Sequence, residues 1–281
     1  MRNILAVWGL LLSLAACTPD NPDPNSKSSR DNNLETGNPS GAEASAASPD
    51  NFLIVRDQYA MSYNSDRGTA NWVSWHLSTA WRGDAERQNN FRVDTDLPGD
   101  FFAAATSHYT GSGFDRGHLC PSEDRDRTEE DNSATFLMTN IIPQAPNNNQ
   151  GVWKKLEEYC RDLSDAGYEM YIIAGPAGKG GYGSNGGSTS SLNGGTIAVP
   201  SHVWKIILIL TNGKRDLDRV DGDTRLIAVK IPNRESVGDD WGNYRVSVDD
   251  LEDLTGFDFL SALSNGIEEE LEERVDDGPT E

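Results

Sequence analysis

The chain is short of cysteine and of apolar residues, and each shortage excludes a class of protein. Three cysteines in 281 residues are too few for a small scaffold held together by disulfides. Paired Cys/His spacings are missing, so we expect no structural zinc site. The apolar run from Ile4 to Leu14 is too short to span a membrane on its own. A hydrophobic share of only 36% predicts unfolded segments beside one large domain.

Basic residues are also scarce: 24 Lys and Arg face 45 Asp and Glu, and the net charge is −21. Part of the excess lies at the ends, since 267–281 has eight acidic residues against one arginine and 18–50 has six against two. The remainder is still acidic, which excludes the broad basic surface that is typical of nucleic-acid binders. Any binding of phosphate therefore needs a metal ion and a few local arginines.

The N-terminus has the pattern of an export signal. Arg2 supplies the positive start, and an apolar core and small residues follow. Leu14-Ala15-Ala16-Cys17 resembles a bacterial lipobox. That resemblance implies removal of residues 1–16, lipid on Cys17 and anchoring to a bacterial cell envelope, with Thr18 favouring the outer membrane. The alternative is an ordinary secretory signal with a chance cysteine, which would leave a periplasmic or secreted protein.

Composition divides the rest of the chain into three parts. Residues 17–50 are rich in Asp, Asn, Pro, Ser, Gly and Ala, with Leu34 as the one large aliphatic residue. Such a segment buries too little apolar surface to offset its ordering entropy, which predicts a disordered tether. Residues 51–266 are predicted to form the folded domain, and 267–281 an acidic, frayed tail.

One polar group lies on a predicted strand from Phe114 to Leu119. Alternate residues of a strand share a face, so Arg116 and His118 point to one side and Asp115 to the other. This places a cation beside a histidine that can act as a base near neutral pH. Asp115 is interpreted as a brace for an arginine or the backbone. His76, on another predicted strand, is interpreted as a hydrogen-bonded sheet histidine.

A second polar group lies on a predicted helix that begins near Asn149. At 100° per residue, Asn149 falls inside the apolar stripe that Trp153 and Leu156 help to form, with Glu157 and Arg161 at its edge. An amide in a core stripe needs hydrogen-bond partners. For Glu157 and Arg161, an ordinary surface salt bridge across one helical turn is the alternative.

Three motifs in order carry a resemblance to a known family. They are Asp115-Arg116-Gly117-His118, then Thr139-Asn140-x-x-Pro143-Gln144, then Asn149-x-x-x-Trp153-x-x-Leu156-Glu157. Together they resemble the DNA/RNA non-specific endonucleases, which include mitochondrial endonuclease G. The resemblance extends roughly from Asn51 to Leu263. It implies an α+β fold with a ββα-metal (His-Me finger) core, set in a mixed or antiparallel sheet flanked by helices.

The resemblance also implies an activity. The family cleaves DNA and RNA phosphodiesters without regard to sugar or sequence, uses Mg²⁺ with Mn²⁺ as an alternative ion, and leaves 5′-phosphate ends. His118 would be the general base that activates water, and Asn149 the direct protein ligand of the ion. Glu157 would hold the waters of the ion, and Asn140 would support the site. The candidates for stabilising the phosphate are Arg87, Arg116 and Arg161.

The sequence leaves open the function, the pairing of two cysteines and the oligomeric state. A lipoprotein whose nuclease fold only binds nucleic acid or a partner protein is one rival, and a phosphodiesterase for small nucleotides or lipids is another. The joint presence of His118, Asn149 and Glu157 favours the nuclease. Cys120 and Cys160 are either a disulfide or two separate buried thiols. DNA and RNA are the expected partners, the membrane is reached only through the N-terminal lipid, and the sequence does not indicate the oligomeric state.

Overall fold

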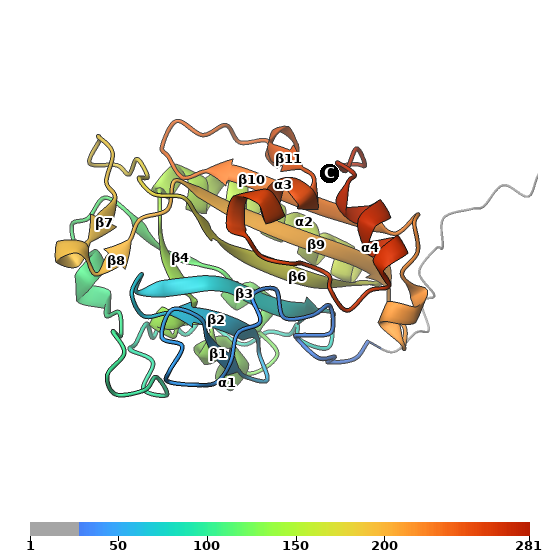
Figure 1. Cartoon of the computed structure of the whole chain (residues 1–281), viewed down its shortest axis with the longest axis horizontal. Helices are drawn as coiled ribbons and strands as arrows, with labels where there is room; N and C mark the ends of the chain where they lie inside the picture. The colour runs from blue at the N-terminus through green and yellow to red at the C-terminus, as the bar shows by residue number, and fades with distance from the viewer. Residues whose placement is uncertain (1–27) are drawn as a thin grey trace, which may run out of the picture.

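A seven-stranded sheet forms the centre of the molecule in the computed structural model, which describes residues 28–281. Its strand order is β1-β2-β3-β6-β9-β10-β11, and every neighbouring pair is antiparallel (Figure 1). The strands are β1 (Phe52–Val55), β2 (Ala60–Asn64), β3 (Thr69–Leu77), β6 (Tyr168–Ala177), β9 (His202–Thr211), β10 (Arg225–Pro232) and β11 (Arg245–Val246). The predicted α+β class is therefore confirmed.

Two small hairpins and several helices complete the fold. The hairpins are β4 (Asp115–His118) with β5 (Ile141–Gln144), and β7 (Ser191–Leu192) with β8 (Ile197–Ala198). The α-helices are α1 (Glu129–Ala134), α2 (Lys154–Asp165), α3 (Val248–Thr255) and α4 (Asn265–Glu272). Shorter turns are η1 (Thr106–Tyr109), η2 (Ser122–Asp124), η3 (Met138–Asn140), the π-helical η4 (Asn148–Trp153), η5 (Asn193–Gly195), η6 (Asp216–Arg219) and η7 (Trp241–Tyr244). No helix in residues 28–281 is long and apolar enough to cross a bilayer.

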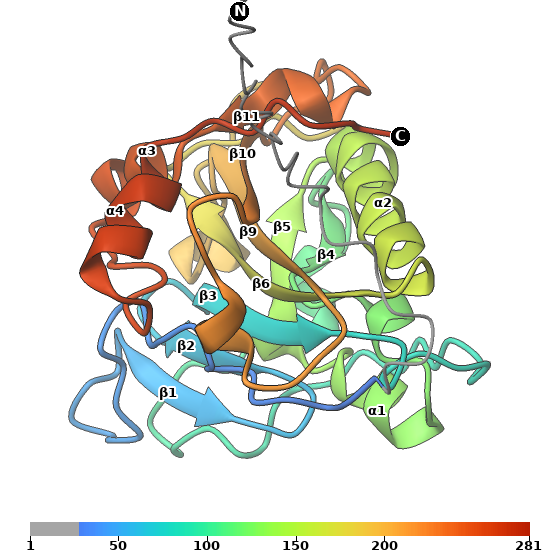
Figure 2. The same cartoon turned by 90° about the vertical axis from the view of Figure 1, so that its right-hand side faces the viewer.

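The sheet is covered on both faces. Figure 2 shows α3 and α4 on one side, with α2 and the β4–β5 hairpin on the other. Trp75 of β3 packs in the core below α2, while its neighbour Trp72 packs in the core below α3 and α4. Side chains thus alternate between the two faces of the sheet along β3. Double coverage also explains why β9 has a nearly continuous apolar run, since a strand buried on both faces needs apolar residues at every position.

The N-terminal segment corrects the prediction of a disordered tether. Residues 28–50 lie against the sheet, and Asn33 is only 5% exposed. Its side-chain oxygen accepts a hydrogen bond from the backbone N–H of His76 at 3.0 Å, and its carbonyl accepts one from the hydroxyl of Ser74 at 2.6 Å. The prediction was wrong here because it counted apolar burial, whereas polar side-chain bonds fix this segment. Residues 1–27, with the predicted signal and Cys17, lie outside the described residues.

The acidic C-terminal end is ordered as well, so the prediction of a frayed tail is wrong. Leu271 of α4 is fully buried in the core. Beyond the helix, the carboxylate of Asp276 accepts bonds from Arg225 at 2.7 Å and from Arg245 at 2.9 Å. Burial tends to raise the pKa of Asp276, but the hydrogen bonds from these two arginines outweigh it and hold the pKa below its ordinary value.

Replacing Asn33 tests whether residues 28–50 belong to the fold. Asn33→Ala removes the acceptor for His76 N–H and leaves buried backbone groups without a partner. We expect the free energy of unfolding to fall by about 1–3 kcal/mol, measured by urea denaturation. Glu43→Ala, at an exposed position of the same segment, is the matched control and should change stability little. Equal stability of both variants would show that the segment adds nothing to the fold.

Candidate active site

A two-stranded hairpin followed by a helix brings the two predicted polar groups together. In the antiparallel hairpin, Asp115 pairs with Gln144 and His118 with Ile141. Gly117 is required at its position, because a Cβ there would lie 2.1 Å from the side-chain oxygen of Gln144. The close approach fixes the Gln144 side chain over the hairpin. The helical segment that follows is the third part of the unit.

The entrance to that helix corrects the predicted helical wheel. Residues 148–153 form a π-helical turn, and Gly151 within it has φ −106° and ψ −106°. Counting back at 100° per residue therefore misplaces Asn149, which is half-buried. The fully buried amide is Asn148 instead. Gln144 donates to its oxygen at 2.6 Å, and its own amide group donates to the carbonyl of Pro232 at 2.8 Å.

Asn149 is oriented by the hairpin. Its amide nitrogen donates to Oδ2 of Asp115 at 2.9 Å, and Gln150 donates to the same oxygen at 2.7 Å. Asp115 is a brace as predicted, but it braces two amides and not an arginine or the backbone. Within residues 28–281, the side-chain oxygen of Asn149 accepts no hydrogen bond. The bond to Asp115 uses the amide nitrogen, so the side-chain oxygen of Asn149 is available to coordinate a ligand.

His118 is 9% exposed and lies among aromatic rings. Its ring centroid is 4.9 Å from that of Phe136 and 5.4 Å from that of Phe91. Burial, together with the charges of Arg87 and Arg116, lowers the pKa of His118 to about 3. The imidazole is therefore neutral at neutral pH and able to accept a proton.

Two arginines flank this histidine. The guanidinium of Arg116 lies 4.2 Å from the ring centroid of Phe91, and that of Arg87 lies 4.9 Å from the ring centroid of Phe136. Arg87 also donates to the hydroxyl of Ser122. In the part of the chain that the structure describes, neither arginine forms an ion pair. Their charges are consequently available to an anion beside His118.

Arg161 differs from these two, because acidic partners already occupy it. It is 6% exposed and forms ion pairs with Glu123 at 2.7 Å and with Asp124 at 3.3 Å. Asp124 in turn accepts a bond from the indole of Trp75 at 3.0 Å. The salt bridges of Arg161 in residues 28–281 thus go to η2, and the simple pair with Glu157 that the helix spacing suggested is not formed.

Asn140 links the start of β5 to the backbone that follows β4. Its amide nitrogen donates to the carbonyls of Cys120 and Thr135, both at 2.9 Å, and its oxygen accepts from the N–H of Cys120 at 3.0 Å. Asn140 therefore fixes the backbone two residues beyond His118. Cys120 itself is a free buried thiol, as is Cys160, so the alternative of two separate thiols is the one observed.

The sequence analysis missed Lys205 of β9. Lys205 is 1% exposed, and its Nζ lies 4.2 Å from the ring centroid of Trp153. The same nitrogen is 3.8 Å from Oε1 of Glu157. Burial raises the pKa of Glu157 to about 7, with Lys205 and Arg161 opposing that rise. The sequence did contain a sign of this pair, because Lys205 interrupts the most apolar strand and a buried charge needs a partner.

Comparisons with known proteins agree with this arrangement. Residues 37–266 match the model of the family described as DNA/RNA non-specific endonuclease. A nuclease of Nostoc sp. (strain PCC 7120 / SAG 25.82 / UTEX 2576) is 50% identical over 243 residues, 86% of this chain and 85% of that protein. The mitochondrial nuclease EXOG of Danio rerio is 34% identical over 211 residues, 73% of this chain and 60% of that protein. The crystal structure of the EndoG/EndoGI complex has the same fold, with a TM-score of 0.67 at 22% identity over 83% of this chain and 91% of that chain.

Removing the charge of Lys205 should raise the pKa of Glu157 further. We expect Lys205→Met to shift it upward by about one unit or more, as followed by carbon NMR of labelled glutamate carboxylates, with Glu157→Gln to assign the signal. Lys205→Arg should keep the pKa near 7. Because this pKa lies above the ordinary value of 4.5, ionising Glu157 costs stability, so the free energy of unfolding should fall between pH 4.5 and 7. Lys214→Met, at an exposed position, is the control, and an unchanged Glu157 signal in Lys205→Met would contradict the pairing.

Proposed function

Because the chain belongs to the DNA/RNA non-specific endonuclease family, and is therefore a nuclease, we propose that it cleaves both DNA and RNA internally, with Mg²⁺, to leave 5′-phosphate ends. The family consists of metal-dependent nucleases. The observation that carries the proposal is a neutral, buried His118 between two arginines that form no ion pair within residues 28–281, on the same strand as the Asp115 that orients the amide of Asn149.

The residues on the helix suit a hard cation that keeps most of its waters. Asn149 would offer its free oxygen as a direct ligand, and Asp115 holds that amide in place. Glu157 would hold the waters of the ion, and its ionised form is the one that can do so. When bound, Mg²⁺ supplies positive charge to the phosphate and the departing 3′ oxygen. Mn²⁺ has the same preference for oxygen ligands and is the expected substitute.

His118 would take the proton of the attacking water. Its pKa of about 3 in the free protein ensures the neutral form but makes a weak base. Burial is the main cause of this low pKa and the charges of Arg87 and Arg116 add to it; a phosphodiester anion between the two arginines would offset their part, so substrate binding should raise the pKa of His118. The histidine thus becomes a stronger base when there is a bond to cleave.

Two exposed arginines, and not a basic surface, would recognise the substrate. Arg87 and Arg116 can pair with phosphate oxygens in two places at once, which suits a contact to the backbone. Contacts to phosphates carry no information about sequence, so cleavage would be non-specific. Arg161, the third arginine expected at the phosphate, is already neutralised by Glu123 and Asp124, so we propose that it holds α2 to η2 and does not act on the phosphate.

For location, we propose export from a bacterium and anchoring through a lipid on Cys17, at the outer membrane. The support is the sequence of residues 2–18 alone, with its positive start, apolar core and lipobox. Mass spectrometry of the mature N-terminus from a bacterial host would reveal the lipid. An unmodified N-terminus after residue 17 would leave a periplasmic or secreted enzyme.

Removing the base should abolish cleavage. We expect the protein from residue 28 onward to degrade plasmid and RNA in Mg²⁺ and to stop in EDTA, and His118→Ala to lose about 10²–10⁴-fold in rate. His202→Ala is the matched control, because that half-buried ring bonds only to Ser201 among the described residues. If a folded protein leaves both polymers intact in Mg²⁺ and in Mn²⁺, the nuclease proposal fails and a binding or small-substrate function takes its place.

A further inference from the structure

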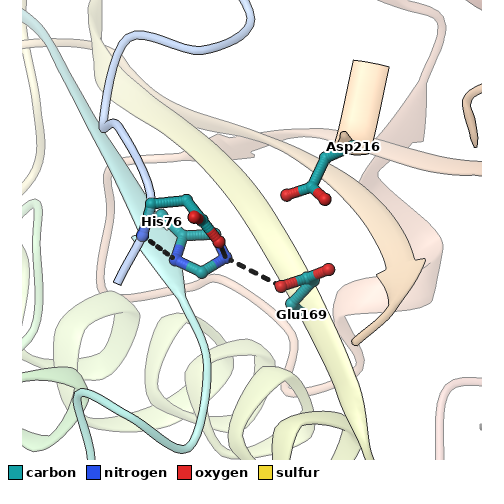
Figure 3. Close-up of side chains that lie close together, drawn as sticks. His76, Glu169 and Asp216 are labelled. Carbon is teal, nitrogen blue, oxygen red and sulfur yellow. Dashed lines mark hydrogen bonds and ion pairs between the residues drawn. The ribbon is translucent and has the colours of Figure 1, made fainter. Parts of the chain in front are cut away.

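A second group of metal-ligating side chains lies on the face of the sheet that is opposite to α2. It combines Asp31 of the N-terminal segment, His76 of β3, Glu169 of β6 and Asp216 of η6. One ligand atom from each lies within 4.8 Å of all the others. Figure 3 shows the side chains of His76, Glu169 and Asp216 pointing toward one another. The group is separate from the candidate active site, because the sheet stands between them.

Two atoms at its centre are buried and complete no hydrogen bond within residues 28–281. Nε2 of His76 and Oε2 of Glu169 face each other across 3.3 Å, and both side chains are fully buried. Oδ2 of Asp31 lies 3.8 Å from the same nitrogen. The two atoms are within ion-pair distance of each other but do not complete a hydrogen bond, and a cation that bound both would satisfy them more fully.

The charges around that point do not balance. Among residues 28–281, Arg219 is the basic side chain in contact, and it pairs with Glu169 and with Asp216, each at 2.8 Å. The hydroxyl of Tyr171 donates to the other oxygen of Asp216 at 2.5 Å. With a neutral His76, one guanidinium faces the three carboxylates of the group, and two negative charges are left. One divalent cation would neutralise them.

We propose that His76, Glu169, Asp31 and Asp216 form a structural site for one divalent transition-metal ion of the Zn²⁺ or Mn²⁺ kind. An imidazole nitrogen with carboxylate oxygens is a ligand set that such ions favour, whereas Mg²⁺ favours oxygen alone. The four ligands come from segments far apart in the chain, so the lack of paired Cys/His spacings, from which we expected no structural zinc site, does not bear on them. The ion would fasten the N-terminal segment to β3 and β6, and so add to the polar bonds of Asn33.

Binding has one consequence for His76. In the structure, the backbone N–H of Asp31 donates to Nδ1 of His76 at 3.3 Å, which places the ring proton on Nε2. An ion on Nε2 requires that proton on Nδ1, so the bond from Asp31 must break. The backbone of Asp31 therefore shifts, and its carboxylate replaces its N–H as the group that contacts the site.

The test measures metal content and not nuclease activity, so its result is independent of the proposed function. An Asn149→Ala background removes the direct ligand of the catalytic ion. After treatment with a chelator and dialysis against micromolar Zn²⁺ or Mn²⁺, we expect one ion per chain and a rise of the melting temperature with ion concentration. Bound Mn²⁺ should show coupling to an imidazole nitrogen in pulsed electron paramagnetic resonance.

Two variants locate the ion. His76→Gln should abolish the nitrogen coupling and the bound ion. Asp31→Asn is the safer variant for folding, because Asp31 is half-exposed, and we expect it to weaken binding about tenfold or more. Asp50→Asn, at an exposed position of the same segment, should bind normally. The proposal is overturned if the Asn149→Ala protein binds neither ion, or if His76→Gln and Asp31→Asn bind both ions as the parent does. In that case the group is an ion-pair network only.

Discussion

A buried ion pair connects the sheet to the helix of the active site. Lys205 stands inside the most apolar strand, under the ring of Trp153, and its partner Glu157 projects from α2. A lysine in that position needs a carboxylate, and a carboxylate at that depth needs a cation. The pair therefore fixes how α2 sits on the sheet. Asn149 lies one π-helical turn before α2, so this contact helps to position the residue, while the bond to Asp115 sets the direction of its amide.

An acidic chain of this kind folds by placing its few arginines where carboxylates gather. Asp276 near the C-terminus is held by Arg225 and Arg245, and Glu123 of η2 by Arg161. Arg87 and Arg116 are the exceptions at the site, because their guanidinium groups lie over aromatic rings. Because aromatic rings and not carboxylates hold these two arginines, their positive charge remains available to a substrate.

The sequence predicted the hairpin and the fold class better than the details of the site. Alternation placed Arg116 beside His118, and that placement needs only the geometry of a strand. The helical-wheel prediction that Asn149 lies in the apolar stripe was wrong, because a π-helical turn cannot be recognised from apolar spacing. Lys205 was missed because its partner is 48 positions away in the chain and meets it only in the folded state. Residues 28–50 were called disordered from composition, which does not register polar side chains that bond to a distant backbone.

The docking of residues 28–50 has a consequence for how far the enzyme could act from a membrane. With that segment bound to the sheet, a lipid on Cys17 would be joined to the folded body by residues 18–27 alone. A fully extended chain of that length reaches at most about 35 Å. With the proposed lipid in place, the folded domain would stay near the bilayer that holds the lipid, and would meet only those polymers that come close to that membrane.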